Sequence, residues 1–171
     1  MKEPKKLTGK AWKFGDSIST DLIAPGRYYH LRTNLPELAK HVLEDADEEF
    51  AGKMSRGDFV VGGRNFGLGS SREHAPLIIK VAGVNAVMAK SFARIFFRNA
   101  INVGLPAIEC DTDKIAQGDE LEVDLQSGVV INKTQGIEIP FAPLPPVMTT
   151  ILEDGGLAAH IAKHGDFDLG E

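Results

Sequence analysis

The fold of this chain is decided around the stretch GGRNFGLGSSREHAP, residues 62–76. The run DFVV at 58–61 precedes it and predicts a buried strand, and the run LIIKVA at 77–82 follows it and predicts a helix. Four glycines, at positions 62, 63, 67 and 69, predict tight turns and close backbone approach. The stretch is therefore predicted to be a strand-to-helix junction with two serines and an arginine where the loop meets the helix.

The elements around this junction alternate between strands and helices. Strands are predicted over 7–12, 58–61, 84–89 and 105–110, and helices over 34–44, 77–82 and 92–103. The expected N-caps are Asn34 for the first helix and Ser91 for the last. This order predicts an α/β fold, in which helices pack on a small parallel or mixed sheet.

The last third of the chain has a different pattern. Gln126-Ser127-Gly128 separates two apolar runs and predicts a β-hairpin, and residues 136–140 read as a third strand. A proline-rich surface crossing at 140–146 and two short helices at 146–154 and 157–163 complete the chain. Because no linker interrupts these elements, we expect a single domain over residues 1–171.

Composition excludes several classes of protein. The 171 residues carry a net charge of −5 without a basic cluster, which argues against nucleic-acid binding. No run of eighteen apolar residues predicts a membrane span, and the start MKEPKK lacks the apolar core of a signal peptide. Cys110 is the only cysteine, so the chain forms no internal disulfide and cannot by itself supply three thiolates to an iron–sulfur cluster. A reducing cytoplasm is the simplest setting.

Two structures are possible where the glycine-rich stretch meets the helix. Ser70 and Glu73 have the spacing of a capping box, which would give the serine a structural role only. Pro76 would then lie inside the helix, where it removes a backbone hydrogen bond. If the helix instead begins near Glu73, Pro76 lies in its first turn, and the serines and Arg72 lie before a helix N-terminus that favours an anion. The residues lack a nucleophile elbow and a phosphate-loop lysine, so by themselves they predict an anion-binding turn but no reaction.

Two further loops carry polar side chains. The run Asp16–Asp21 is polar, and most of its side chains are expected to bond to local backbone, because the chain has no glutamate at the spacing of a calcium loop. The segment RYYHLRT, residues 27–33, lies before the predicted helix at 34–44 and is rich in side chains that bind carboxylates. Its tyrosines and leucine could equally pack against the core while its arginines stay in solvent.

Several segments together resemble the aconitase superfamily swivel domain. They are NFGLGSSREH at 65–74, AKSFARIFF at 89–97, NAINVGLP at 99–106 and FGDSISTDLI at 14–23. A free-standing chain of this length resembles the small subunits of 3-isopropylmalate dehydratase (isopropylmalate isomerase) and of homoaconitase. The resemblance implies a single swivelling β/β/α domain of the aconitase C-terminal type, a mixed sheet with packed helices and a C-terminal β-hairpin region.

The resemblance also implies an activity and roles for residues of the junction. It makes Ser70 the catalytic base, and Ser71 and Arg72 ligands of a substrate carboxylate. The reaction is the isomerisation of 2-isopropylmalate and 3-isopropylmalate by dehydration and rehydration in leucine biosynthesis, a hydro-lyase reaction. No cofactor or metal is expected in this chain, because the [4Fe-4S] cluster belongs to a large catalytic partner subunit, and a heterotetramer is one assembly that this allows. Members often carry cysteine where this chain has Leu68, which is taken as variation.

The same resemblance assigns substrate choice to residues 29–33, which are Tyr29, His30, Leu31, Arg32 and Thr33. An arginine here resembles the loop of homoaconitases, which binds an extra carboxylate of a tricarboxylate substrate. Isopropylmalate needs an apolar surface instead, because an unpaired guanidinium beside an isopropyl group is costly. His30 replaces the tyrosine usual in the homoaconitase loop. Isopropylmalate is the leading substrate because that assignment is commoner for such chains. A homoaconitase subunit and a non-enzymatic anion-binding or RNA-binding module are the alternatives.

Overall fold

One seven-stranded sheet organises the computed structural model, which describes residues 6–70 and 74–165. Its strand order is β4-β3-β2-β1-β5-β6-β7. The strands are β1 Lys6–Lys13, β2 Phe59–Val61, β3 Ala86–Ala89, β4 Ala107–Glu109, β5 Glu120–Asp124, β6 Val129–Asn132 and β7 Ile137–Pro140. Strands β1 to β4 pair in parallel, whereas β5 to β7 continue the sheet in antiparallel register from the other side of β1. The mixed α/β sheet predicted from the sequence is thereby confirmed.

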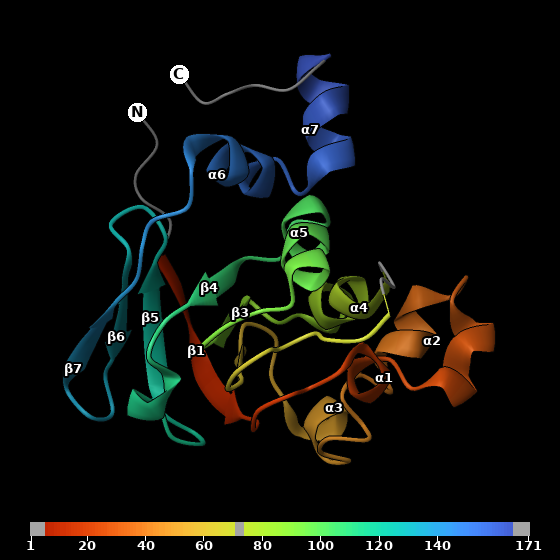
Figure 1. Cartoon of the computed structure of the whole chain (residues 1–171), viewed down its shortest axis with the longest axis horizontal. Helices are drawn as coiled ribbons and strands as arrows, with labels where there is room; N and C mark the ends of the chain where they lie inside the picture. The colour runs from red at the N-terminus through yellow and green to blue at the C-terminus, as the bar shows by residue number, and fades with distance from the viewer. Residues whose placement is uncertain (1–5, 71–73, 166–171) are drawn as a thin grey trace.

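Helices connect the parallel strands and extend from the last antiparallel one. They are α1 Thr20–Ile23, the 3₁₀ helix η1 Gly26–Leu31, α2 Leu35–Ala39, α3 Phe50–Lys53, α4 His74–Ala82, α5 Arg94–Asn102, the 3₁₀ helix η2 Thr112–Lys114, α6 Pro146–Glu153 and α7 Leu157–His164. In Figure 1, α2 lies beside α4, and α6 and α7 lie at the top of the view next to α5. Within the described part of the chain, no helix is long and apolar enough to cross a membrane.

Strands β2 and β3 are buried on both faces, as their continuous apolar runs predict. Because successive side chains of a strand point to opposite faces, Val60 of β2 packs into the core under the helices, whereas Phe59 and Val61 pack into a second core. That second core also contains side chains of β5, β6 and β7. The sheet therefore curls, so that its antiparallel half covers one face of the parallel half while the helices cover the other.

Two predicted helix boundaries are wrong, and in each case a tertiary contact explains the difference. The N-cap of α5 is Ala93 rather than Ser91, whose hydroxyl instead accepts a hydrogen bond from the backbone N–H of Asn65 at 2.8 Å. The helix predicted over 34–44 is capped by Asn34 as expected, but it ends at Ala39. Beyond it, the fully buried Leu43 has φ +57° and donates its N–H to a carbonyl of α1 at 2.9 Å.

Candidate functional site

The glycine-rich loop, residues 62–69, leaves β2 at the carboxyl edge of the parallel strands. It runs beside the polar loop, residues 14–19, which leaves β1 at the same edge. Backbone hydrogen bonds continue the pairing of the two strands into these loops: Gly67 N–H donates to the carbonyl of Ile18 at 2.7 Å, and Thr20 N–H donates to that of Leu68 at 2.8 Å. In open α/β sheets ligands bind at this edge, where the loops after neighbouring strands meet.

The other side of the glycine-rich loop is held by the segment after β3. Phe66 N–H donates to the carbonyl of Ser91 at 3.0 Å, and Ala93 N–H donates back to the carbonyl of Phe66 at 2.9 Å. Figure 1 shows the loop as an irregular yellow segment that runs toward α4. The glycine-rich loop is therefore held by backbone hydrogen bonds on both sides.

Close approach is tightest at two of the four glycines. Gly67 has φ +84°, and a Cβ on it would lie 2.1 Å from the ring of Phe96. A Cβ on Gly63 would lie 1.9 Å from Oδ1 of Asp16, the same oxygen that accepts the N–H of Arg64 at 2.7 Å. The tight turns and close approach predicted from these glycines are confirmed, and the loop can follow this path only with glycine at these positions.

Ser70 lies at the end of the glycine-rich loop with an exposed side chain. Its Oγ is 3.2 Å from Oγ1 of Thr20, the first residue of α1, which is only 2% exposed. Ser19 caps α1 by accepting the N–H of Leu22 at 3.2 Å, which fixes the turn that carries Thr20. This contact between two hydroxyls was not predicted from the sequence, because the side chains of residues 16–21 were expected to bond to local backbone.

The predicted carboxylate ligands Ser71 and Arg72 lie outside the described residues, as does Glu73. Helix α4 is described from His74, so the described residues do not decide between the two predicted starts of this helix. Ser70 is the last described residue before this gap, and its exposed hydroxyl is open to a ligand.

The predicted specificity loop lies beside the start of α4. The ring of Tyr29 is centred 5.9 Å from that of His74, the first residue of α4. The guanidinium carbon of Arg32 lies 4.4 Å from the centre of the Tyr29 ring, and its Nη1 donates to the carbonyl of Tyr29 at 3.2 Å. Tyr29 is 48% exposed and Arg32 is exposed as well. The exposed ring of Tyr29, with the guanidinium of Arg32 over it, therefore lies at the edge of the junction.

Other side chains of this loop have different environments. His30 and Thr33 are exposed, whereas Leu31 is half-buried and packs against the core. Arg27 makes two hydrogen bonds to the carboxylate of Asp45, at 2.9 and 2.7 Å. This pairing raises the pKa of Arg27 and lowers the pKa of Asp45. Arg27 is thus committed to a structural ion pair, and Arg32 is the arginine of the loop that a ligand can reach.

The sole cysteine has the chemistry of a buried thiol. Burial raises the pKa of Cys110 to about 12. Thiolates rather than thiols bind iron, so the raised pKa opposes metal binding. With one cysteine in 171 residues, the chain does not provide the ligand set of a [4Fe-4S] cluster.

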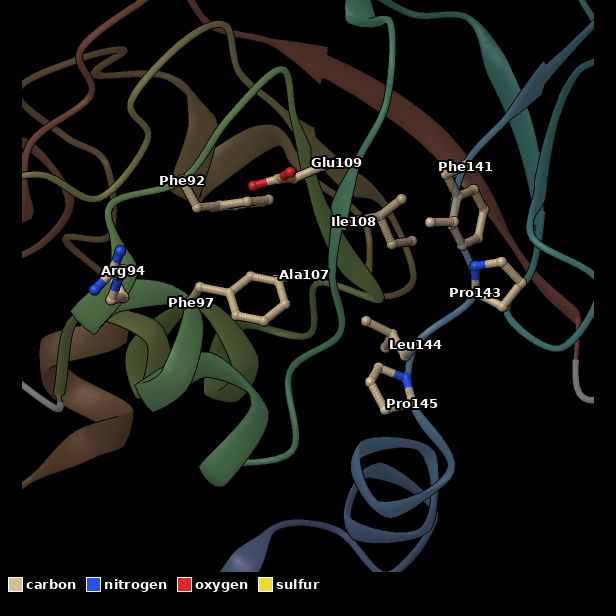
Figure 2. Close-up of a pocket in the computed structure, with 11 residues that line it drawn as sticks. Phe92, Arg94, Phe97, Ala107, Ile108, Glu109, Phe141, Pro143, Leu144 and Pro145 are labelled. Atoms are coloured by element: carbon tan, nitrogen blue, oxygen red, sulfur yellow. The ribbon is translucent and has the colours of Figure 1, made fainter.

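A groove of about 520 Å³ lies elsewhere, between α5, β4 and the proline-rich crossing (Figure 2). Its lining residues are Phe92, Arg94, Phe97, Ala107, Ile108, Glu109, Phe141, Ala142, Pro143, Leu144 and Pro145. This described lining is apolar except for one arginine and one glutamate, and it includes none of the predicted site residues. The glycine-rich loop, with its exposed hydroxyl, is therefore the better candidate for chemistry.

Comparison with known proteins identifies relatives along nearly the whole chain. The model of the family described as aconitase C-terminal domain matches residues 17–113, which include the end of the polar loop, the specificity loop and the glycine-rich loop. Similar sequences are 3-isopropylmalate dehydratase small subunit 2 of Archaeoglobus fulgidus, 66% identical over 96% of this chain and 99% of that protein, and small subunit 1 of Thermotoga maritima, 62% identical over 94% and 98%. A crystal structure of 3-isopropylmalate dehydratase from Methanocaldococcus jannaschii superposes with a TM-score of 0.91 at 44% identity, covering 94% of this chain and 96% of that one.

Proposed function

This chain belongs to the aconitase C-terminal domain family, and from that premise we propose that it is the small subunit of a 3-isopropylmalate dehydratase, a hydro-lyase active only with its large subunit. The observation that carries the proposal is identity of 66% and 62% to proteins of that name over nearly their whole lengths. The family resemblance drawn from residues 14–23 and 65–74 is thereby confirmed. The reaction is the interconversion of 2-isopropylmalate and 3-isopropylmalate by loss and re-addition of water.

Within this reaction we assign the role of base to Ser70. Its hydroxyl is exposed at the carboxyl edge of the parallel strands, where a substrate carbon can approach it. A serine removes a proton from carbon only if its alkoxide is stabilised by oriented donors. The hydroxyl of Thr20, 3.2 Å away and buried, can donate to Ser70 Oγ and so stabilise the deprotonated form. Thr20 is thus proposed as a positioning residue for the base.

Substrate carboxylates are assigned to Ser71 and Arg72, on the strength of the family motif alone. A planar guanidinium binds a carboxylate through two parallel hydrogen bonds, which would fix the substrate relative to Ser70. A [4Fe-4S] cluster, when bound, supplies a Lewis-acidic iron. The single cysteine of this chain does not fit such a cluster, so we place it in the large subunit, within a heteromer such as a heterotetramer in a reducing cytoplasm.

Substrate choice is assigned to the exposed pair Tyr29 and Arg32. The names of the relatives support isopropylmalate, whereas a guanidinium held over an aromatic ring, 4.4 Å from its centre, suits an additional carboxylate. If Arg32 meets such a carboxylate, the subunit would prefer a tricarboxylate of the homoaconitase type. If it lies in solvent beside the bound substrate, isopropylmalate remains the preferred substrate.

Reconstitution tests the function directly. The chain is mixed anaerobically with a large subunit that carries three cluster-binding cysteines, and turnover of isopropylmalate and of a homocitrate-type acid is compared. We expect turnover of isopropylmalate by the mixture and none by either subunit alone. Preferred turnover of the tricarboxylate would identify a homoaconitase. Anion or RNA binding without turnover of either acid would support a non-enzymatic module.

Arg32→Ala sharpens the substrate assignment in the same complex. If Arg32 contacts a substrate carboxylate, the variant loses kcat/KM for the tricarboxylate selectively, by roughly 10-fold or more, because a charge-assisted hydrogen bond is lost. The matched control is Arg98→Ala, because Arg98 is also an exposed arginine but lies on α5. An unchanged ratio of the two kcat/KM values would leave Arg32 as a surface residue.

A further inference from the structure

A second group of titratable side chains lies at the turn between α6 and α7, on elements that the proposed reaction does not use. Asp154 ends α6, and Gly155 and Gly156 follow with φ +90° and +129°. These conformations suit glycine and reverse the chain, so that the carboxylate faces α7. His160 and His164, four residues apart on α7, present their rings on the same side of that helix.

The three side chains converge on one oxygen. Nδ1 of His160 lies 2.8 Å from Oδ2 of Asp154, and Nε2 of His164 lies 2.9 Å from the same atom. Their ligand atoms all lie within 4.8 Å of one another. His160 is fully buried, the side chain of Asp154 is 7% exposed and that of His164 is 28% exposed. The cluster is therefore mostly enclosed, with one open side at His164.

The turn that carries the cluster is fixed to the body of the protein. Nζ of Lys80 donates to the carbonyl of Gly155 at 2.9 Å and to that of Val103 at 2.7 Å. A Cβ on Gly156 would lie 2.7 Å from the carbonyl oxygen of Asn102, so the turn packs directly on the end of α5. Because the backbone of this turn is fixed, the side chains of the cluster are held in place without a ligand.

We propose that Asp154, His160 and His164 form a binding site for a first-row divalent metal ion, with Zn²⁺ as the best fit. Two imidazole nitrogens and one carboxylate oxygen are the ligand types that bind Zn²⁺, and three protein ligands leave a fourth position for water. Bonds of about 2.0–2.1 Å place tetrahedral ligands about 3.3 Å apart. The present spacings of 2.8 and 2.9 Å would widen by a few tenths of an ångström.

The charge state of the cluster suits a cation at neutral pH. Hydrogen bonds from His160, Lys163 and His164 lower the pKa of Asp154 to about 2, so its carboxylate is ionised. Lys163 is the opposing feature, because its ammonium lies 3.1 Å from Oδ1 of Asp154. Its side chain is 60% exposed and can move into solvent, and it contacts the oxygen that the histidines do not use. The ion would join α6 to α7 and add stability through binding to the folded state.

The experiment uses the full chain without an affinity tag, stripped of metal with a chelator. Zn²⁺ is titrated against a chromophoric competitor, and Co²⁺ is added separately to record its absorption spectrum. We expect one ion per chain, the intense visible bands of tetrahedral Co²⁺, and a Tm that rises with Zn²⁺ and falls again with chelator. Affinity should decrease in acid, because protons compete with the metal ion for its ligands.

Variants separate a metal site from an ion-pair network. Because His160 is buried, the exposed His164 carries the main test: His164→Gln should weaken Zn²⁺ binding at least about tenfold and change the Co²⁺ spectrum. Lys163→Gln should strengthen binding by removing a competing charge, whereas loss of an ion pair alone would only lower Tm. The control His41→Gln lies in the turn after α2, where His41 stacks on Tyr28, and should change neither readout. Absence of Zn²⁺ binding by the parent chain, or equal affinity in His164→Gln, would overturn the proposal.

Discussion

Two polar side chains, one from each half of the sheet, have opposite surroundings. At the edge of the parallel half, the hydroxyl of Ser70 is exposed and lies near only one other hydroxyl among the described hydrogen-bond partners. In the antiparallel half, Asp119 is 5% exposed and accepts hydrogen bonds from Ala116 N–H at 2.9 Å, Asn132 at 2.8 Å and Gln135 at 2.7 Å. The hydroxyl of Ser70 can therefore form further hydrogen bonds to a ligand, whereas the carboxylate of Asp119 forms its hydrogen bonds within the fold.

Topology explains the difference. Parallel strands need long crossover connections, so the loops that follow β1, β2 and β3 all gather at one edge. Antiparallel strands are joined by short turns, and their polar groups are paired across those turns. We therefore expect loss of a polar side chain at the open edge of the parallel half to impair turnover, and loss of one in the antiparallel half to impair stability.

Of these substitutions, Ser70→Ala should lower kcat the most. It tests directly whether the exposed serine of the parallel half is the base. Loss of a general base lowers kcat by roughly 10²–10⁴-fold. Because the side chain is exposed, Tm should change little. Steady-state kinetics of the reconstituted complex measure the effect, and Ser127→Ala, at an exposed serine of the β5–β6 hairpin, is the control. A variant that keeps turnover within a few fold of the parent would contradict the assignment of Ser70.

Gly67→Ala tests the backbone of the glycine-rich loop against that of a hairpin. The new methyl would combine a left-handed φ of +84° with a contact of 2.1 Å to Phe96. We expect a cost of about 2–5 kcal/mol in the free energy of unfolding, from strain and overpacking together. Gly136→Ala, between β6 and β7, has φ +69° but open space around the new atom, so it should cost only about 1–2 kcal/mol. Urea unfolding of the isolated subunit gives the free energy of unfolding of both variants. Equal costs would mean that the ring of Phe96 moves aside to make room for the new methyl.

Asp119→Ala should destabilise the subunit without lowering kcat of the complex that still assembles. It leaves the amides of Asn132 and Gln135 without their acceptor, which costs about 2–3 kcal/mol. Chemical denaturation gives the stability, and turnover per assembled complex gives kcat. A fall in kcat at unchanged stability would mean that the antiparallel half reaches the active site.

The same residue gives a pH dependence. Burial alone would raise the pKa of Asp119, but hydrogen bonds from Ala116, Asn132 and Gln135 outweigh it and lower the pKa below the usual 3.8. A lowered pKa in the folded state means that this stability is present above pH 3.8 and is lost as pH falls through the folded-state pKa. Acid unfolding of Asp119→Ala should therefore have a shallower slope in that range than the parent chain. Identical slopes would show that the carboxylate gains nothing from its partners.

Local sequence patterns predicted the sheet and most of its elements, because apolar runs and turn residues act over a few positions. They did not predict contacts between distant segments. Ser91 was predicted to cap a helix but binds the backbone of Asn65, and Leu43 was predicted as helical but turns back toward α1. Ser70 was predicted as part of the site, whereas its neighbour Thr20 was not, since fifty residues separate them.

Thr20→Val is the smallest and sharpest test, because it changes the site without opening a cavity. Valine keeps the shape of the buried side chain and removes the hydroxyl that lies 3.2 Å from Ser70 Oγ. Loss of one neutral hydrogen bond is worth about 1 kcal/mol, which corresponds to a roughly fivefold lower kcat. If Thr20 acts through the base, its substitution should have no further effect in a chain that already carries Ser70→Ala. Additive effects in that double variant would instead mean that Thr20 has a structural role in α1, as Asp119 has in the antiparallel half.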